Sequence, residues 1–116
     1  MSDSIAELTK LAIAFRDERD WKQFHNPKDM ALSLVLEAAE VLELMQWKNG
    51  RELDEHLSRN RQKLAEELSD VMFWVLAMSN DLEIDLGAAF KAKLIANARK
   101  YPIDKAKGVS TKYTDL

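Results

Sequence analysis

The chain has 116 residues, a net charge of −3 and no cysteine. This length suits one domain of ordinary size, and without cysteine the chain has neither a disulfide framework nor a thiolate metal site. No apolar run approaches the roughly 18 residues that a membrane-spanning helix needs, and the N-terminus lacks the plan of a signal peptide. These features predict a cytoplasmic protein, and the absence of a basic cluster argues against a nucleic-acid partner.

The apolar residues recur at helical spacing, and glycine and proline are scarce, which predicts an all-α fold. A first helix is expected to begin after the cap residue Ser4 and to run to about Arg19. Asn26, followed by proline, is typical of an N-cap. A second helix is therefore expected from that proline to about Trp47, with Gly50 as its C-terminal stop.

Two further long helices are predicted downstream. A short helical stretch, Glu52 to Leu57, is expected to lead into a third long helix from about Asn60 to Met78. Asp85 is the predicted cap of a fourth helix over residues 86–100. This helix should end there because Pro102 disfavours helical geometry in the residue before it.

The segment after Pro102, IDKAKGVSTKYTDL, is polar and carries no helical or strand-like pattern. We expect it to be irregular or mobile. The sequence therefore predicts one folded domain over residues 1–102, followed by a polar C-terminal tail over residues 103–116.

The predicted second helix is apolar on nearly all faces, yet it carries carboxylates inside that apolar surface. Glu37 and Glu40 are three residues apart and share one face, and Glu67 and Asp70 repeat this arrangement on the third helix. Four converging carboxylates would repel one another strongly in a low dielectric. A divalent cation is therefore expected, and oxygen ligands without histidine or cysteine favour Mg²⁺, with Mn²⁺ as a substitute.

Two other interpretations of these acids remain open. The carboxylates could form ordinary ion pairs, for instance between Glu67 and Lys63 one turn earlier, although two pairs at identical spacing favour the metal. Alternatively, the chain is a non-catalytic helical dimerisation module whose buried acids set pairing specificity. In either case, a helix that is apolar all round belongs in a core or under a partner subunit, so we expect an oligomer.

Cationic and aromatic side chains could complete a nucleotide site. Lys93 and Asn97 share a face of the fourth helix and could hold phosphate oxygens, unless the lysine is there only for the helix dipole. Trp74 lies on the face of the second acidic pair and Trp47 lies beyond the first, and Trp21 is in the preceding loop; each could support a nucleobase. If the two acidic helices are antiparallel, one cavity could use both Trp47 and Trp74 only with a second subunit.

The motifs EAAE and ELSD, about 26 residues apart, resemble the E-x-x-E and E-x-x-D signature of the all-α nucleoside triphosphate pyrophosphohydrolases of the MazG type. The strings RDWKQFHNP, ELMQWK, EELSDVMFW and KLIANARKYP are similar to the dCTP pyrophosphatase branch of that family. The resemblance covers roughly Ile5 to Pro102. It implies a four-helix MazG-like bundle, completed by homodimer or dimer-of-dimers packing. It also implies Mg²⁺-dependent hydrolysis of a (deoxy)nucleoside triphosphate to the monophosphate and pyrophosphate.

The resemblance also assigns site residues. It gives the metal ligands as Glu37, Glu40, Glu67 and Asp70, and either Glu40 or Glu67 could instead act on the attacking water. The expected substrate-binding residues are Trp21, His25, Trp47, Trp74, Lys93 and Asn97.

Two base-contacting positions differ from the close eukaryotic relatives: Ala12 stands where they have histidine, and Trp74 where they have tyrosine. One polar contact to the base is thereby lost and space is added. We expect an enzyme of nucleotide-pool house-cleaning that hydrolyses dCTP and at least one other deoxynucleoside triphosphate. An enzyme of the same superfamily that acts on dUTP or phosphoribosyl-ATP is the alternative.

Overall fold

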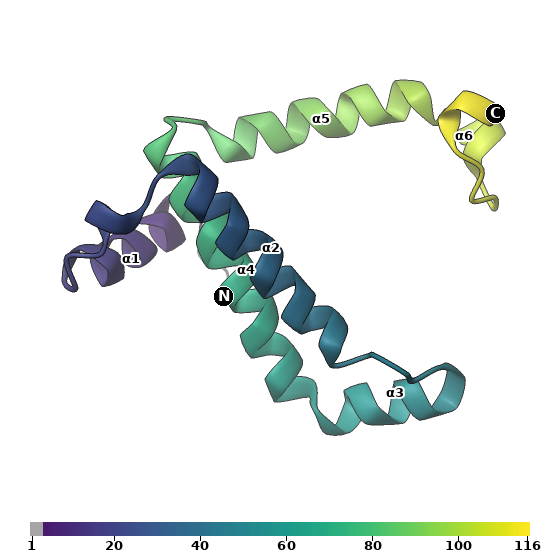
Figure 1. Ribbon diagram of the computed structural model, residues 1–116. Helices are drawn as coiled ribbons and strands as arrows, with labels where there is room; N and C mark the ends of the chain where they lie inside the picture. Colours follow the sequence, from purple (N-terminus) through teal and green to yellow (C-terminus); the bar gives the residue numbers. More distant parts are fainter. Residues whose placement is uncertain (1–3) are drawn as a thin grey trace. The chain divides into compact units, whose positions relative to one another are not determined.

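The computed structural model describes residues 4–116, and this part of the chain is built from helices without a β-strand, which confirms the predicted fold class (Figure 1). The α-helices are α1 (Ile5–Asp17), α2 (Pro27–Glu43), α3 (Gly50–Arg59), α4 (Arg61–Asp81), α5 (Leu86–Lys100) and α6 (Ile103–Ala106). The chain divides into two compact units, one ending at Glu83 and one spanning Ile84–Leu116. None of the described helices has the length and apolar character needed to cross a membrane.

Side-chain caps start three helices at the predicted positions. Ser4, Asn26 and Asp85 each accept a hydrogen bond from the backbone N–H three residues later, at 3.1, 2.9 and 3.1 Å respectively. Each bond satisfies an N–H group that the first turn of a helix leaves without an intrahelical partner. These local signals were readable in the sequence, and α5 has the predicted bounds.

The helix ends differ from the prediction. α1 ends at Asp17 rather than Arg19, and α2 ends at Glu43 rather than Trp47. Trp47 has a φ of +69°, a left-handed conformation that a right-handed helix cannot continue through. The prediction that Gly50 is the stop of this helix was wrong, because Gly50 is the first residue of α3.

The two helices after this turn are longer than predicted. The polar stretch predicted at Glu52 to Leu57 is part of α3, which has ten residues. α4 begins one residue after the predicted start at Asn60 and continues beyond Met78 to Asp81. The segment that was expected to connect the third and fourth long helices therefore contributes its first residues to α4.

The unit that ends at Glu83 is organised around α4. α2 and α4 run side by side in opposite directions, and α1 also packs against α4 (Figure 1). Met30, Leu76 and Ala77 form the buried apolar core. Next to this core Arg16, which is 1% exposed, donates from Nη1 to Asp81 Oδ2 at 2.7 Å. This buried ion pair ties α1 to the C-terminal end of α4.

The expectation that α2 is buried on all its faces is not met within a single chain. Val35, Leu36 and Leu42 are 64%, 64% and 66% exposed. On α5, Phe90 and Leu94 are likewise more exposed than buried, so the stripe that they share with Lys93 is not a core face of one chain. Exposed apolar groups of this number are unfavourable in water and are typical of surfaces that bind another molecule.

The prediction of an irregular C-terminal tail was wrong for two short segments. α6 follows Pro102, and a single 3-10 turn spans Tyr113–Asp115. The rings of Tyr101 and Tyr113 are 5.9 Å apart, and Lys100 Nζ lies 4.8 Å from the Tyr113 ring. These contacts fold the tail onto the end of α5. The predicted domain boundary after residue 102 stays a prediction.

Candidate functional site

The structure brings the four predicted metal ligands together. Glu37 and Glu40 on α2, and Glu67 and Asp70 on α4, each offer one carboxylate oxygen, and these oxygens lie within 4.8 Å of one another. The two residues of each pair are nearly one turn apart and so share a helix face. The antiparallel contact of α2 with α4 turns these two faces toward each other, and we call the result the carboxylate cluster.

The carboxylate cluster has a buried side. Glu67 is 6% exposed and Glu37 is half-buried, whereas Glu40 and Asp70 are exposed. Oε2 of Glu37 and Oε2 of Glu67 are buried and have no hydrogen-bond partner among the described residues. Burying a carboxylate oxygen without a partner is costly. A hard cation with oxygen ligands, such as Mg²⁺ or Mn²⁺, would satisfy both atoms, so these residues fit a divalent metal.

One lysine offsets part of the negative charge. Lys63 Nζ lies 2.9 Å from Glu67 Oε1, so the ion pair that was considered as an alternative to a metal site is present beside the cluster. The Lys63 hydrogen bond, and the one that a protonated Glu40 can donate, lower the pKa of Glu67, although burial opposes the shift. Glu67 therefore remains ionised at neutral pH.

The pKa of Glu40 is shifted in the opposite direction from that of Glu67. The hydrogen bonds that a protonated Glu40 can donate to Glu67 and Glu37, together with the negative charges of both, raise the pKa of Glu40 to about 7. Without a cation the cluster thus holds a proton at Glu40 over much of the acidic range. A bound cation and this proton would relieve the same repulsion.

A cleft of about 350 Å³ joins the carboxylate cluster to aromatic side chains. Its lining residues are Phe15, Trp21, Glu37, Ser69, Asp70, Phe73 and Trp74. The volume lies within the range of small-molecule sites, and a mostly apolar lining with a few polar groups is typical of them. The cleft therefore offers carboxylates and flat rings to one ligand.

The aromatic side chains of the cleft contact one another edge to face. Ring centroids are 5.7 Å apart for Trp21 and Phe15, 6.2 Å for Phe15 and Phe73, and 5.1 Å for Phe73 and Trp74. His25 extends the series, with its ring centroid 5.0 Å from that of Trp74. Such pairs add stability beyond their buried area, so each ring helps to fix the orientation of the next.

The three tryptophans have different positions. Trp21 and Trp74 line the cleft, and their contact with a base stays a prediction. Trp47 follows α2 and is 88% exposed. Because α2 and α4 are antiparallel (Figure 1), Trp47 and Trp74 extend from the carboxylate cluster in opposite directions, as helix geometry predicted.

The other predicted substrate-binding residues do not line the cleft of the described chain. His25 is half-buried and contacts the Trp74 ring. Burial and the charge of Arg16 lower the pKa of His25, so its ring is neutral at pH 7. Lys93 is exposed and Asn97 half-buried on α5, in the unit Ile84–Leu116. Their contact with phosphate stays a prediction.

Three residues that line the cleft were not among the predicted site residues: Phe15, Ser69 and Phe73. Ser69 lies between two of the acids and was not considered. A usable signal was present in the string ELSDVMFW, because Phe73 comes three residues after Asp70 and so shares its helix face.

Comparison with known proteins identifies the family. Residues 32–116 match the MazG-like family. The chain belongs to the MazG-like family. It is 38% identical to dCTP pyrophosphatase 1 of Bos taurus and 39% identical to that of Homo sapiens, over 97% of this chain and 68% of each relative. The crystal structure of a pyrophosphatase from Archaeoglobus fulgidus matches with a TM-score of 0.80 and 36% identity, covering 88% of this chain and 95% of that one.

We expect Glu40→Gln to stabilise the metal-free protein most at alkaline pH. The pKa of Glu40 is raised from 4.5 to about 7, so the folded state loses stability as the pH rises through 7 and Glu40 ionises. Glutamine cannot ionise. In EDTA, the melting temperature of the wild type should fall between about pH 5 and about pH 8, and that of the variant should fall less.

Glu43→Gln is the matched control, because Glu43 is an exposed glutamate at the end of the same helix and outside the carboxylate cluster. Its melting temperature should follow that of the wild type across the pH range. The same pH response in both variants would contradict the assignment of the effect to Glu40.

Proposed function

We propose that this enzyme, a nucleoside triphosphate pyrophosphohydrolase, hydrolyses dCTP and at least one other deoxynucleoside triphosphate in a Mg²⁺-dependent reaction. The single observation that supports this best is the shared cleft, in which Glu37 and Asp70 border the same space as Trp21 and Trp74. A nucleotide needs such neighbours, a cation site for its phosphates and flat rings for its base. Relatives called dCTP pyrophosphatase 1 match nearly the whole chain and favour this substrate.

The residues that would hold Mg²⁺ are Glu37, Glu40, Glu67 and Asp70. When bound, the ion would supply positive charge against the triphosphate and its departing pyrophosphate. The unpartnered oxygens of Glu37 and Glu67 point to this role, since both atoms are buried. Lys63 keeps Glu67 ionised and so in the form that binds a cation.

The reaction adds water across the bond between the first and second phosphates, and yields the monophosphate and pyrophosphate. A carboxylate that accepts the proton of this water must be able to reach it. One oxygen of Glu67 is engaged by Lys63 and the other is buried. Glu40 is exposed, so it fits the role of general base better than Glu67 does.

Base recognition in this proposal relies on stacking. Trp21 and Trp74 supply ring faces, and stacking contributes roughly 1–3 kcal/mol per base while tolerating every base. Strong discrimination would need polar groups that a wrong base leaves unpaired. Ala12, which the family resemblance places at the base, has no polar side-chain group, and this favours a tolerant enzyme.

An oligomer is part of the proposal. Lys93 and Asn97, four residues apart on one helix face, are proposed to bind phosphate oxygens. Trp47 follows α2 and extends from the carboxylate cluster in the direction opposite to Trp74, so it could contribute only to a cleft of a second copy. The exposed apolar residues of α2 give a reason for two copies to associate.

We expect Glu40→Gln and Asp70→Asn each to lower the rate of pyrophosphate release at least about a hundredfold at saturating Mg²⁺, because each removes a charged ligand. Circular dichroism should report a folded protein in both cases. Glu43→Gln should retain wild-type activity. Near wild-type turnover in either cluster variant would count against the metal site.

A pyrophosphate-release screen over the common ribo- and deoxynucleoside triphosphates tests the substrate range. We expect dCTP and at least one further deoxynucleotide to be hydrolysed within about a hundredfold of each other, a difference of about 2.7 kcal/mol in activation free energy. A larger preference for dCTP would refute the tolerant cleft. Absence of dCTP turnover, with dUTP or phosphoribosyl-ATP as the substrate, would favour the alternative in the same superfamily.

Sedimentation equilibrium should detect a dimer or a dimer of dimers. Leu36→Lys places a charge in the exposed apolar face of α2 and should shift the equilibrium toward smaller species. Glu43→Gln, at the end of the same helix, should leave the association state unchanged. A wild-type protein that is monomeric at every concentration would exclude the proposed assembly.

A further inference from the structure

We infer that the buried Arg16–Asp81 ion pair positions the aromatic wall of the cleft and thereby sets how well the substrate's base is held. The aromatic wall consists of the rings of Phe15, Trp21, Phe73 and Trp74. The inference rests on the proposed function, because it concerns the base of a nucleotide in that cleft. Neither residue lines the cleft, so both act through the side chains that do. They are positioning residues.

The pair connects two helices that are far apart in the sequence. Arg16 lies on α1 and Asp81 on the last turn of α4, and they are 65 positions apart in the sequence. Among the ion pairs of residues 4–116 it is the one that joins two helices, since the others link adjacent residues or one helical turn. Burial raises the pKa of Asp81, but the hydrogen bonds from Arg16 and Asn80 lower it by more. The net shift is downward, so Asp81 is ionised at neutral pH.

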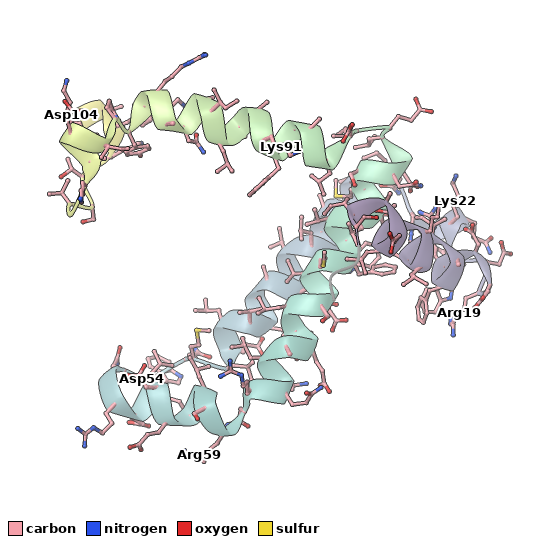
Figure 2. All side chains as sticks on the ribbon, turned by 180° about the vertical axis from the view of Figure 1, so that it is seen from behind. Arg19, Lys22, Asp54, Arg59, Lys91 and Asp104 are labelled. Atoms are coloured by element: carbon pink, nitrogen blue, oxygen red, sulfur yellow. The ribbon has the colours of Figure 1, made fainter. Side chains whose placement is uncertain are left out.

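Arg16 is linked to the aromatic wall by its neighbour Phe15 and by its own backbone carbonyl group. Phe15 precedes it and places its ring 6.2 Å from Phe73 and 5.7 Å from Trp21. The N–H of Trp21 donates to the carbonyl oxygen of Arg16 at 3.2 Å, which holds the loop after α1. Figure 2 labels Arg19 and Lys22, which lie on either side of Trp21 in the segment that follows α1. Movement of Arg16 would therefore displace Phe15 and Trp21, the part of the aromatic wall that α1 and its following loop supply.

The carboxylate cluster does not depend on this pair. All four acids belong to α2 and α4, which pack directly against each other. Asp81 lies eleven residues beyond Asp70, about three helical turns away. Loosening α1 should therefore disturb the base and leave the phosphate end of the cleft intact.

The composition of the pair also favours a positioning role over one in stability. Apolar side chains of similar volume often stabilise a protein as well as a buried ion pair does. Nε of Arg16 is buried without a hydrogen-bond partner in the described part of the chain, which is unfavourable. The short charge-assisted hydrogen bond to Asp81 instead fixes the orientation of the Arg16 side chain, which apolar contacts would not do.

The test compares two substrates in Mg²⁺: dCTP, and 2-deoxyribose 5-triphosphate, which has no base. For Asp81→Asn and Arg16→Met we expect the KM for dCTP to rise about tenfold while kcat changes less than about twofold. Both constants for the baseless substrate should stay within about twofold of the wild type. A loss of base contact predicts this split, because the interaction removed is one of binding.

Asp17→Asn is the matched control. Asp17 is an exposed carboxylate 3.6 Å from Nε of the same arginine, and its removal should alter neither substrate's constants. The double variant Arg16→Asp with Asp81→Arg restores an ion pair and should bring the KM for dCTP back to within about threefold of the wild type. This variant decides the question if the single variants do not fold.

Each result supports or overturns the inference. Equal losses with both substrates, or a kcat that falls with an unchanged KM, would assign the pair a general structural role and overturn it. So would a folded double variant that keeps the raised KM. If the wild type hydrolyses neither substrate, the proposed function itself fails, and this outcome is distinct from a wild type that turns over while its variants lose both substrates alike.

Discussion

The confinement of four carboxylates between α2 and α4 is the constraint on which the site depends. Like charges within 4.8 Å repel, so the arrangement persists only where other charges compensate. Lys63 provides one compensating charge, and the proton on Glu40 provides another when no cation is bound. The proposed metal would replace that proton. A site of this kind is unfavourable for folding and favourable for binding, and α2 and α4 must pack closely enough to hold it.

In the proposed function, the two ends of a nucleotide are recognised by different helix contacts. The carboxylate cluster belongs to the α2–α4 pair, whereas the aromatic wall is completed by α1 and its following loop. The apolar core beneath them is small, with Met30, Leu76 and Ala77 as its buried members. With so small a core, the edge-to-face ring contacts and the Arg16–Asp81 pair help to orient the side chains of the cleft. A substitution at the proposed base end of the cleft can therefore leave the proposed phosphate end unchanged, and the reverse holds as well.

How far the sequence allowed prediction depends on the range of the interaction. Ser4, Asn26 and Asp85 cap helices through bonds within three residues, and all three helix starts were predicted correctly. The carboxylate cluster was predictable because helical spacing fixes each acidic pair. The left-handed turn at Trp47 and the contact of Tyr113 with Tyr101 depend on packing that no periodicity announces. The Arg16–Asp81 bond spans 65 positions, beyond the reach of any local pattern.

The different surroundings of the three tryptophans have an optical consequence. Trp47 is almost wholly in water, at 88% exposed, while Trp74 is half-buried against His25 and Phe73. Fluorescence from Trp47 should be red-shifted and open to quenching by a dissolved quencher, whereas Trp74 should emit at shorter wavelength. A ring that stacks in the cleft would alter the emission of Trp74 and Trp21 first. The chain thus contains its own spectroscopic reporter of cleft occupancy.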